Sequence, residues 1–460
     1  MNYWTGKNIL VIGAARQGLA ATRFLSRNGA KVTLNDGKKS SQLDEVINSL
    51  DDPSIKFHFG SHPLSLLNEK DAICVSGGVP LDIPLIKEAR TKGIPITNDA
   101  QIFLDQITAN VIGITGSAGK TTTTTLIGEI AKSATQPPEN VWVGGNIGNP
   151  LIDQVDQMSD NDWVVMELSS FQLELIKKSP NIALVTNITP NHLDRHKTME
   201  KYVDAKANIL AFQGPSDIAI LNRDDPNAYA LRGRVKGRLL TFGSSKPDAN
   251  HCNTFIENGM IKYFDGKFSH AIMSLDEIKL KGKHYHLNIL AACAVGMAAD
   301  FPVESIAEGI RNVKSIAHRL ELVLTRNGIS WVNDSIATAP ERVIAALDAI
   351  DGPLVLLLGG RDKNLPWENL AEKIAIRQPK LILFGEAGEM IENILRKEIY
   401  CGRSCQIDRF NNFNDAVRHA SKIAIPGESV LLSPGGTSYD AFVDFEERGN
   451  LFREIVENFA

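Results

Sequence analysis

The sequence has few cysteines, no excess of basic residues and no long apolar run. Only 5 of its 460 residues are Cys, and 49 Lys and Arg stand against 54 Asp and Glu, giving a net charge of −5. An acidic balance disfavours a nucleic-acid-binding protein, because neutralising phosphates requires a basic surface. No run reaches the roughly 18 apolar residues of a membrane helix, and the first residues lack the layout of a secretion signal. We therefore expect a cytoplasmic protein that inserts into no membrane and binds no nucleic acid.

The five cysteines are odd in number and mostly far apart, which favours reduced thiols over a disulfide framework. Cys401 and Cys405 are spaced closely enough to bind a metal ion together. Without a second close pair, however, we interpret them as part of a surface loop. Glycine and proline are at background levels, with 36 and 20 residues, which excludes collagen-like and low-complexity proteins.

Short apolar runs alternate with stretches of helical periodicity along the whole chain, which predicts βα units, parallel sheets and an α/β fold. The length favours three domains of about 150 residues each, and we place them at residues 1–99, 100–316 and 317–460. Residues 8–36 form a Rossmann-like strand–helix–strand unit, with the helix expected at 18–28. Residues 246–283 alternate short polar and apolar segments, which we interpret as a hairpin region. Further strands are expected at 72–76, 94–97, 110–115, 163–166, 182–187, 217–221, 331–333, 354–358, 381–384 and 429–432.

The clearest local motif follows the predicted strand 110–115 and precedes an apolar-periodic helix. It reads Thr115-Gly116-Ser117-Ala118-Gly119-Lys120-Thr121 and has the context of a phosphate-binding loop. Glycines let backbone N–H groups close around phosphate oxygens, and the helix N-terminus adds a favourable field. Lys120 reaches the terminal phosphates, and the Thr121 hydroxyl can hold Mg²⁺. Ile114 stands where the full pattern has glycine, so a glycine turn without a ligand is the alternative.

A weaker glycine motif, Gly13-Ala14-Ala15-Arg16-Gln17-Gly18, follows the first strand. It lacks the central glycine of a dinucleotide fingerprint, although Asp36 ends the second strand where a ribose contact is expected. A nucleotide-like ligand and purely structural glycines both remain open, and NAD is disfavoured.

Three further residues are candidates for a metal site. Glu167 lies at the carboxyl end of the predicted strand 163–166, where ligands of open α/β sheets bind; the alternative is a helix N-terminal charge beside capping serines. His192 and His196 resemble a metal-ligand pair, but zinc needs further ligands, so a nucleotide and Mg²⁺ role for His192 and a solvated loop both stay open. By itself, Lys206 in a helical stretch is typical of a solvated face.

Taken together, the motifs resemble the Mur ligase family along the entire chain. The resemblance rests on residues 115–121, 167–174, 187–206, 318–321 with 333–335, and 433–438 through 445–449. It implies a Rossmann-like N-terminal domain, a P-loop ATPase-like central domain and a Rossmann-like C-terminal domain that bind a UDP-sugar, ATP and an amino acid. Segments 167–174 and 433–449 point to the member that adds D-glutamate to UDP-N-acetylmuramoyl-L-alanine through an acyl phosphate, in peptidoglycan synthesis. A monomer is expected.

The resemblance also implies roles for individual residues. Catalysis is assigned to Lys120, Glu167, His192 and Lys206. Mg²⁺ is held by Thr121, Glu167, His192 and Lys206, with the lysine carbamylated to N6-carboxylysine. ATP is bound by Gly116, Ser117, Ala118, Gly119, Lys120, Thr121, Asn288, Arg319 and Asp334. The UDP-substrate contacts Asp36, Ser76, Gly78 and Asn146, and glutamate contacts Thr338, Lys363, Ser438 and Phe445.

The sequence departs from the family pattern at three places. Tyr285 stands where many members have asparagine, Ile336 where many have lysine, and Gly435-Gly436-Thr437 replaces the commoner Ala-Cys-Ala. The Lys-to-Ile change removes a charge near the phosphates. The alternatives are a ligase adding L-glutamate or another amino acid, a folylpolyglutamate synthase, an inactive regulatory homologue, and a P-loop motor or switch. The uridine-type first domain, the four catalytic residues and the two additional α/β blocks disfavour the last three.

Overall fold

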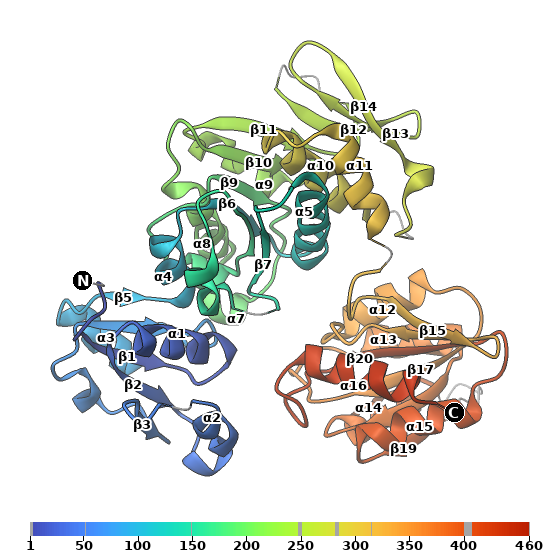
Figure 1. The fold of residues 1–460 in the computed structure, drawn as a ribbon. Helices are drawn as coiled ribbons and strands as arrows, with labels where there is room; N and C mark the ends of the chain where they lie inside the picture. Colours follow the sequence, from blue (N-terminus) through green and yellow to red (C-terminus); the bar gives the residue numbers. More distant parts are fainter. Residues whose placement is uncertain are drawn as a thin grey trace. The chain divides into compact units, whose positions relative to one another are not determined.

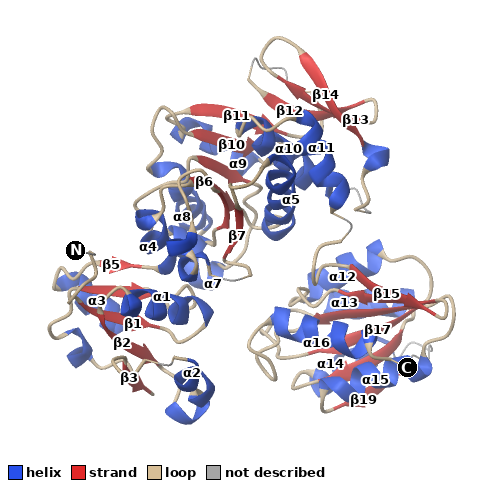
Figure 2. Cartoon of the chain, in the orientation of Figure 1, coloured by secondary structure: helices blue, strands red, loops and turns tan. Residues whose placement is uncertain are grey.

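The computed structural model divides the chain into two compact units, residues 1–313 and 314–460 (Figure 1). The described residues form three sheets, two in the first unit and one in the second, with helices packed against each (Figure 2). Among the described helices, none is both long and apolar enough to span a bilayer. Cys401 and Cys405 lie outside the described residues, which are 3–50, 52–148, 150–246, 251–280, 285–313, 315–399 and 407–459.

The first sheet is parallel and has the order β3-β2-β1-β4-β5. Its central strand is covered on both faces, since Ile9 and Val11 join one apolar cluster and Leu10 and Ile12 another. The helix predicted at 18–28 begins earlier, at Arg16. The elements are β1 (Asn8–Ile12), α1 (Arg16–Arg27), β2 (Lys31–Asp36), α2 (Asp44–Ser49), β3 (Lys56–Phe59), β4 (Ala72–Val75), α3 (Pro84–Thr91) and β5 (Ile96–Thr97).

The second sheet has the order β14-β13-β12-β11-β10-β9-β6-β8-β7. The strands are β6 (Asn110–Thr115), β7 (Val141–Gly145), β8 (Trp163–Glu167), β9 (Ile182–Val185), β10 (Ile218–Asn222), β11 (Arg238–Phe242), β12 (Asn253–Glu257), β13 (Met260–Phe264) and β14 (Ser269–Ser274). The pairs β12–β13 and β13–β14 are antiparallel, and the other pairs of this sheet, including β11–β12, are parallel. The predicted hairpins are thus confirmed within the described part of 246–283.

Helices of the first unit surround this second sheet and join it to the first. Helix α5 packs against α10 and α11, and α10 is buried along nearly all of its length. One apolar cluster runs from Trp4 through α4 to Leu231, so the two sheets share a core. The helices are α4 (Asp99–Gln106), α5 (Lys120–Ala134), α6 (Ser170–Leu173), α7 (Leu193–His196), α8 (Met199–Ala211), α9 (Pro226–Ala230), α10 (His286–Ala298) and α11 (Val303–Asn312).

The second unit holds a sheet of order β15-β16-β20-β17-β18-β19, in which only the β15–β16 pair is antiparallel among the described strands. Its strands are β15 (Glu321–Arg326), β16 (Ile329–Asn333), β17 (Leu354–Gly359), β18 (Lys380–Phe384), β19 (Ile407–Phe410) and β20 (Ser429–Gly435). Its helices are α12 (Pro340–Ala349), α13 (Glu368–Arg377), α14 (Gly388–Ile399), α15 (Phe413–Ile423) and α16 (Phe445–Glu457).

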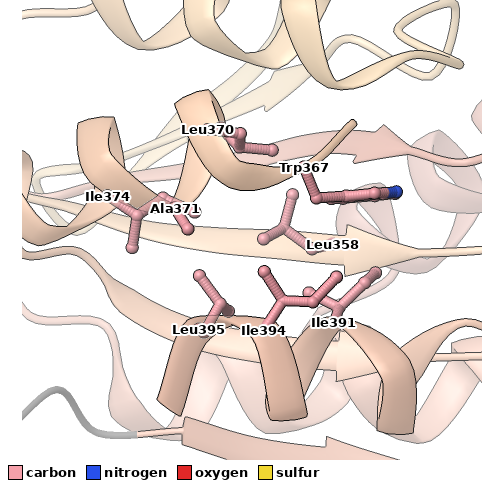
Figure 3. Close-up of a pocket in the computed structure, with 8 residues that line it drawn as sticks. All are labelled: Leu358, Trp367, Leu370, Ala371, Ile374, Ile391, Ile394 and Leu395. Atoms are coloured by element: carbon pink, nitrogen blue, oxygen red, sulfur yellow. The ribbon is translucent and has the colours of Figure 1, made fainter. Parts of the chain in front are cut away.

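Apolar side chains fill both faces of this sheet. Figure 3 shows side chains of α13 and α14 pointing toward one another beside Leu358 of β17. The space between these side chains is too small to hold a water molecule. Interiors packed this closely resist small displacements, so they hold the loops at the ends of the strands in place.

Candidate active site

The phosphate-binding loop connects β6 to α5, as predicted. A Cβ atom at Gly116 would lie 1.8 Å from Thr186 Oγ1, and one at Gly119 would lie 2.3 Å from Asn288 Oδ1, so both positions require glycine. The backbone N–H groups of Ser117 and Ala118 donate to Asn187, over 2.9 and 2.8 Å. The first turn of α5 follows directly, and its N–H groups have no partner within the helix. This helix end can therefore bind an anion.

Two lysines share one carbonyl of this loop. Gly116 O accepts hydrogen bonds from Lys120 Nζ over 3.0 Å and from Lys206 Nζ over 2.8 Å. Lys206 in α8 is 1% exposed. Burial, and then the neighbouring Lys120, lower the pKa of Lys206 well below its usual value, while Glu167 opposes the shift. The interpretation of Lys206 as a solvated residue, which its helical context alone favoured, is wrong.

Sequence reasoning missed Tyr202, which lies one turn before Lys206 on α8. Its ring centroid is 4.8 Å from Lys206 Nζ, and its hydroxyl is 2.9 Å from Ser117 Oγ. The spacing of four residues on a helix places both side chains on one face, so the pairing was available from the sequence. Tyr202 thus joins the buried lysine to the phosphate-binding loop.

Glu167 ends β8 and is 1% exposed. Its Oε2 accepts the Thr121 hydroxyl over 2.9 Å, and its Oε1 accepts Asn146 Nδ2 over 2.9 Å. Helix α6 is capped instead by Ser169, whose side chain accepts the N–H of Gln172. The structure therefore brings together three of the predicted residues: Thr121 of the phosphate-binding motif, Glu167 of β8, and Asn146 in the segment after β7. Their oxygens are of the type that Mg²⁺ prefers.

Asn288 lies in α10 and is close to the same loop. Its Oδ1 accepts the Thr123 hydroxyl of α5 over 3.3 Å, and this amide also limits position 119 to glycine. Tyr285, the departure from the family pattern, is buried at the N-cap of α10. The structure thus places Asn288 beside the candidate phosphate site, and its predicted adenine contact stays a prediction.

His192 and His196 have different surroundings. His192 is exposed, adopts a left-handed φ of 53°, and its ring lies edge-on to Phe171 with 5.1 Å between ring centroids. His196 is buried, with Nε2 2.9 Å from Ser170 Oγ and Nδ1 3.1 Å from Glu174 Oε1. No group of three or more His, Cys, Asp or Glu residues is arranged to hold a metal ion within the part of the chain that the structure describes.

Arg195, between these histidines, contacts the loop that follows β4 of the first sheet. Its guanidinium donates to the carbonyls of Gly77 and Val79 over 2.8 and 2.6 Å, and lies 4.0 Å from the Phe171 ring centroid. It therefore fixes the loop that carries Ser76 and Gly78 to the segment that carries His192. Sequence reasoning examined this segment only for metal ligands and missed the arginine.

The glycine motif after β1 has a structural explanation. A Cβ atom at Gly18 would lie 1.8 Å from Gly13 O, and one at Gly13 would lie 2.8 Å from Ser76 Cβ. Asp36 Oδ2 accepts the N–H of Ala14 over 2.7 Å, so the carboxylate orients this turn. Ser76 is buried beside it and Gly78 is exposed. These contacts leave the predicted ligand role of Asp36, Ser76 and Gly78 as a prediction.

In the second unit the predicted residues lie after the carboxyl ends of β16, β17 and β20. Lys363 Nζ donates to Thr338 Oγ1 over 3.3 Å. Ser438 is 2% exposed, and Phe445 begins α16 with its carbonyl accepting the Ser335 hydroxyl over 2.8 Å. Ends of parallel strands on one sheet edge are where such folds bind ligands.

Asp334 lies at the same edge and is buried. It accepts the Ser433 hydroxyl over 2.8 Å and the N–H of Leu320 over 3.2 Å. Burial raises its pKa to about 7, against the opposing effect of these hydrogen bonds and of the Arg319 and Arg342 charges. The carboxyl group of Asp334 therefore keeps its proton to a higher pH than a solvent-exposed aspartate does.

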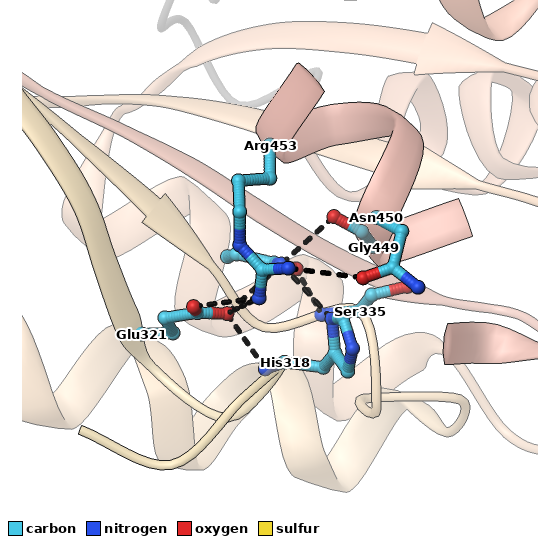
Figure 4. Close-up of polar contacts among 7 residues, drawn as sticks. His318, Glu321, Ser335, Gly449, Asn450 and Arg453 are labelled. Carbon is cyan, nitrogen blue, oxygen red and sulfur yellow. Dashed lines mark hydrogen bonds and ion pairs between the residues drawn. The ribbon is translucent and has the colours of Figure 1, made fainter. Parts of the chain in front are cut away.

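A polar network holds the turn on which Arg319 sits (Figure 4). The N–H of His318 donates to Glu321 Oε2 over 2.8 Å, and Arg453 of α16 donates to Glu321 Oε1 over 2.7 Å. A Cβ atom at Gly449 would lie 2.2 Å from His318 Nδ1, which requires glycine there. The fully buried Arg448 donates to Ser335 O over 2.9 Å. Sequence reasoning missed both arginines of α16.

These features define an α/β protein with a P-loop and acidic, basic and hydroxyl groups gathered around it. Three family models match successive parts of the chain: the Mur ligase MurD-like N-terminal domain at 7–98, the Mur ligase middle domain at 114–296, and the Mur ligase glutamate ligase domain at 318–436. The chain belongs to the Mur ligase family.

Individual relatives agree with this assignment. The chain is 40% identical to the UDP-N-acetylmuramoylalanine–D-glutamate ligase of Symbiobacterium thermophilum, over 97% of each chain. It is 38% identical to the ligase of the same name from Koribacter versatilis, over 99% of this chain and 98% of that one. Two solved structures share the fold. UDP-N-acetylmuramate-alanine ligase MurC from Thermotoga maritima matches with a TM-score of 0.60 and 18% identity, over 98% of this chain and 99% of that chain. MurF from Acinetobacter baumannii matches with a TM-score of 0.60 and 17% identity, over 94% of this chain and 87% of that chain.

Proposed function

We propose that this protein is an ATP-dependent, ADP-forming ligase that adds D-glutamate to UDP-N-acetylmuramoyl-L-alanine in peptidoglycan precursor synthesis. The observation that carries the proposal is the site around Gly116 O, where Lys120 and the buried Lys206 meet, in a chain that matches D-glutamate ligases along nearly its full length. An inactive homologue would have no need to keep a lysine buried in this position, because burying an ammonium group is costly.

The chemistry follows from the low reactivity of a carboxylate toward an amine. Transfer of the γ-phosphoryl group of ATP to the alanyl carboxylate gives an acyl phosphate, which the amine of glutamate attacks with release of phosphate. The barrier is lowered by positioning and by charge stabilisation on the transferring group. Lys120 and the N-terminus of α5 supply positive charge for this purpose.

Mg²⁺ fits the residues around Glu167. The carboxylate and the Thr121 hydroxyl already lie 2.9 Å apart, and we propose that His192 and a carbamylated Lys206 complete the set. The metal ion would neutralise phosphate charge. A lysine must be neutral to react with CO₂, and the burial that lowers the pKa of Lys206 favours the neutral amine. The carbamate is an anion, which replaces an unfavourable buried cation by a group that a metal ion can bind.

Each substrate is assigned to one part of the chain. We propose that residues 1–99 bind the UDP-sugar through Asp36, Ser76 and Gly78, that Asn146 contacts the same substrate, and that residues 100–316 bind ATP. Residues 317–460 bind glutamate through the side chains of Thr338, Lys363, Ser438 and Phe445. The roles of Asn288, Arg319 and Asp334 toward ATP stay predictions, as do a cytoplasmic location and a monomeric state.

A phosphate-release assay tests the proposal. The full chain is given ATP, Mg²⁺ and UDP-N-acetylmuramoyl-L-alanine in parallel reactions with D-glutamate, L-glutamate, D-aspartate or no amino acid. We expect phosphate release with D-glutamate well above the other three reactions. Turnover with L-glutamate alone would overturn the choice of amino acid and keep the ligase chemistry, and release that no amino acid stimulates would overturn the ligase.

A further inference from the structure

Arg195 connects two segments of the first unit that are far apart in the sequence. Its Nη1 donates to the carbonyl of Gly77 over 2.8 Å, and its Nη2 donates to the carbonyl of Val79 over 2.6 Å. Both carbonyls belong to the turn 76–79, in which the N–H of Val79 donates to Ser76 O over 2.9 Å. Because a guanidinium is planar and rigid, two hydrogen bonds from it fix the orientation of the turn as well as its distance.

The turn 76–79 also has contacts of its own with the first sheet. A Cβ atom on Gly13 would lie 2.8 Å from Ser76 Cβ and 2.9 Å from Val79 Cγ2, so the turn packs directly on the glycine motif after β1. The N–H of Ser76 donates to Ile12 O over 2.9 Å. What Arg195 adds is therefore a fixed position of the turn relative to the second sheet.

The same guanidinium lies against the ring of Phe171, with 4.0 Å between Arg195 Cζ and the ring centroid. His192 meets the edge of that ring, and His196 stacks on it with 5.3 Å between ring centroids and 11° between ring planes. His196 is buried, so this group of side chains is anchored in the interior. Arg195 thus ties the turn to the packed group that includes His192, a proposed Mg²⁺ ligand.

Arg195 differs from an arginine such as Arg23, which also joins the two sheets of this unit. Arg23 of α1 pairs with Asp153, in the segment after β7, over 3.1 Å, and both side chains are partly exposed. Ion pairs of this kind contribute little and tolerate small displacements. Arg195 donates instead to two backbone carbonyls beside residues that we expect to bind substrate, so its loss would change the geometry of the substrate site.

We propose that Arg195 is a positioning residue for the UDP-substrate. It holds the turn 76–79 in register with His192, so that a substrate bound at the turn presents its alanyl carboxylate to the metal and phosphate site. The inference rests on the proposed function, which assigns the turn to the UDP-substrate and His192 to Mg²⁺. Turnover should depend strongly on this register, because a small misplacement of a reacting group can lower a rate about 100-fold.

The first experiment compares two ligands of different length, which separates a positioning role from a local one. The full chain is titrated with UDP, which needs only the first sheet and its turn, and with UDP-N-acetylmuramoyl-L-alanine, which must also reach the second sheet. Arg195→Ala should bind the whole substrate about tenfold more weakly, because two hydrogen bonds from a charged donor are lost. Its affinity for UDP should change less than about twofold, since the turn keeps its contacts with Gly13 and Ile12.

Turnover gives a second readout. The kcat of Arg195→Ala should fall about 10- to 100-fold, while the KM for ATP stays within about twofold of the wild type. Arg195→Lys keeps the cation and can form one of the two hydrogen bonds, so it should recover part of the kcat. Should Arg195→Ala melt at a lower temperature than the wild type, Arg195→Lys carries the same comparison of UDP with the whole substrate.

Arg23→Ala is the matched control, because it removes another guanidinium that joins the same two sheets. Its affinity for the whole substrate and its kcat should stay close to those of the wild type. An equal loss of affinity for UDP and for the whole substrate in Arg195→Ala would overturn the inference, since Arg195 would then act on the turn alone. Wild-type turnover in Arg195→Ala, or the same losses in Arg23→Ala, would overturn it as well.

Failure of the proposed function would look different. A wild-type chain that binds the whole substrate in the expected Arg195-dependent way but ligates no amino acid would refute the ligase assignment alone.

Discussion

The carbonyl oxygen of Glu167 lies 2.4 Å from the position that a Cβ atom on Gly145 would occupy. Gly145 ends β7 with a left-handed φ of 107°, and its neighbour Asn146 donates from its backbone N–H to the same carbonyl over 2.9 Å. The close approach of the ends of β7 and β8 therefore fixes the position of Glu167 relative to Asn146. It exists only because residue 145 has no side chain.

We expect Gly145→Ala to be destabilising by about 3 kcal/mol or more. The added Cβ atom would strain the left-handed backbone at this position and would also overlap with the carbonyl oxygen of Glu167. Ligase activity should fall with it, since the Glu167 carboxylate would shift. Gly148→Ala is the matched control: φ is also positive, at 57°, but no heavy atom lies within 4 Å of the added Cβ. Gly148→Ala should lower the free energy of unfolding by only about 1 kcal/mol. Equal melting temperatures for the two variants would contradict the proposed contact.

Lys120→Ala should abolish ATP-dependent phosphate release, with a loss of at least about 100-fold, because a positive charge on the transferring phosphoryl group is removed. Binding of the UDP-substrate should remain nearly intact, since its predicted residues belong to other segments. Lys132→Ala, an exposed position on the same helix, serves as the control. Equal loss of both functions with an unchanged melting curve would contradict the domain assignment.

Lys206→Ala should be nearly inactive. If the missing group is a carbamate, short-chain carboxylic acids should restore part of the activity, and native mass analysis of the wild type should show a CO₂ adduct. Lys201→Ala, exposed on the same helix α8, should retain activity and show no response to the acids. Full activity of Lys206→Ala would remove this lysine from the mechanism.

Lys363→Ala should raise the KM for glutamate about tenfold or more, with little change in the KM for ATP, because a charge-assisted hydrogen bond to a carboxylate is lost. Steady-state kinetics with each substrate varied in turn measure the two constants. Lys422→Ala, exposed on α15, controls for the loss of a surface charge. An equal rise in both KM values would place Lys363 outside the glutamate pocket.

Asp99 predicts a dependence of stability on pH. It is buried at the start of α4, its Oδ2 accepts Gln172 Nε2 over 3.2 Å, and burial raises its pKa to about 6 from 3.8. The folded chain therefore keeps a proton that the unfolded chain releases, so the free energy of unfolding falls as pH rises from about 4 to about 6.

Asp99→Asn removes this titration. Relative to the wild type, the free energy of unfolding of this variant should be higher by about 1 to 3 kcal/mol above pH 6 and nearly unchanged at pH 4. Melting curves from pH 4 to pH 8 measure the difference, with Asp105→Asn at an exposed position of α4 as control. A difference that does not change with pH would contradict the buried charge.

Local pattern determined much of this protein. The alternation of apolar runs and helical stretches predicted the α/β fold, and a glycine-rich turn between a strand and a helix predicted the phosphate-binding loop, because these signals depend on residues close together in the chain. The position of Glu167 after an apolar strand was likewise enough to predict that it ends β8, beside the loop at the end of β6.

Only the tertiary structure decided which distant residues meet. Lys206 looked like a surface lysine because burial depends on the packing of α8 against the loop 91 residues earlier in the chain. The contacts of Arg195 with the loop that follows β4 also join segments that no local pattern connects. Electrostatics and burial act through space, so the pKa of Lys206 and the charge around Asp334 could be assigned only once these segments were in place.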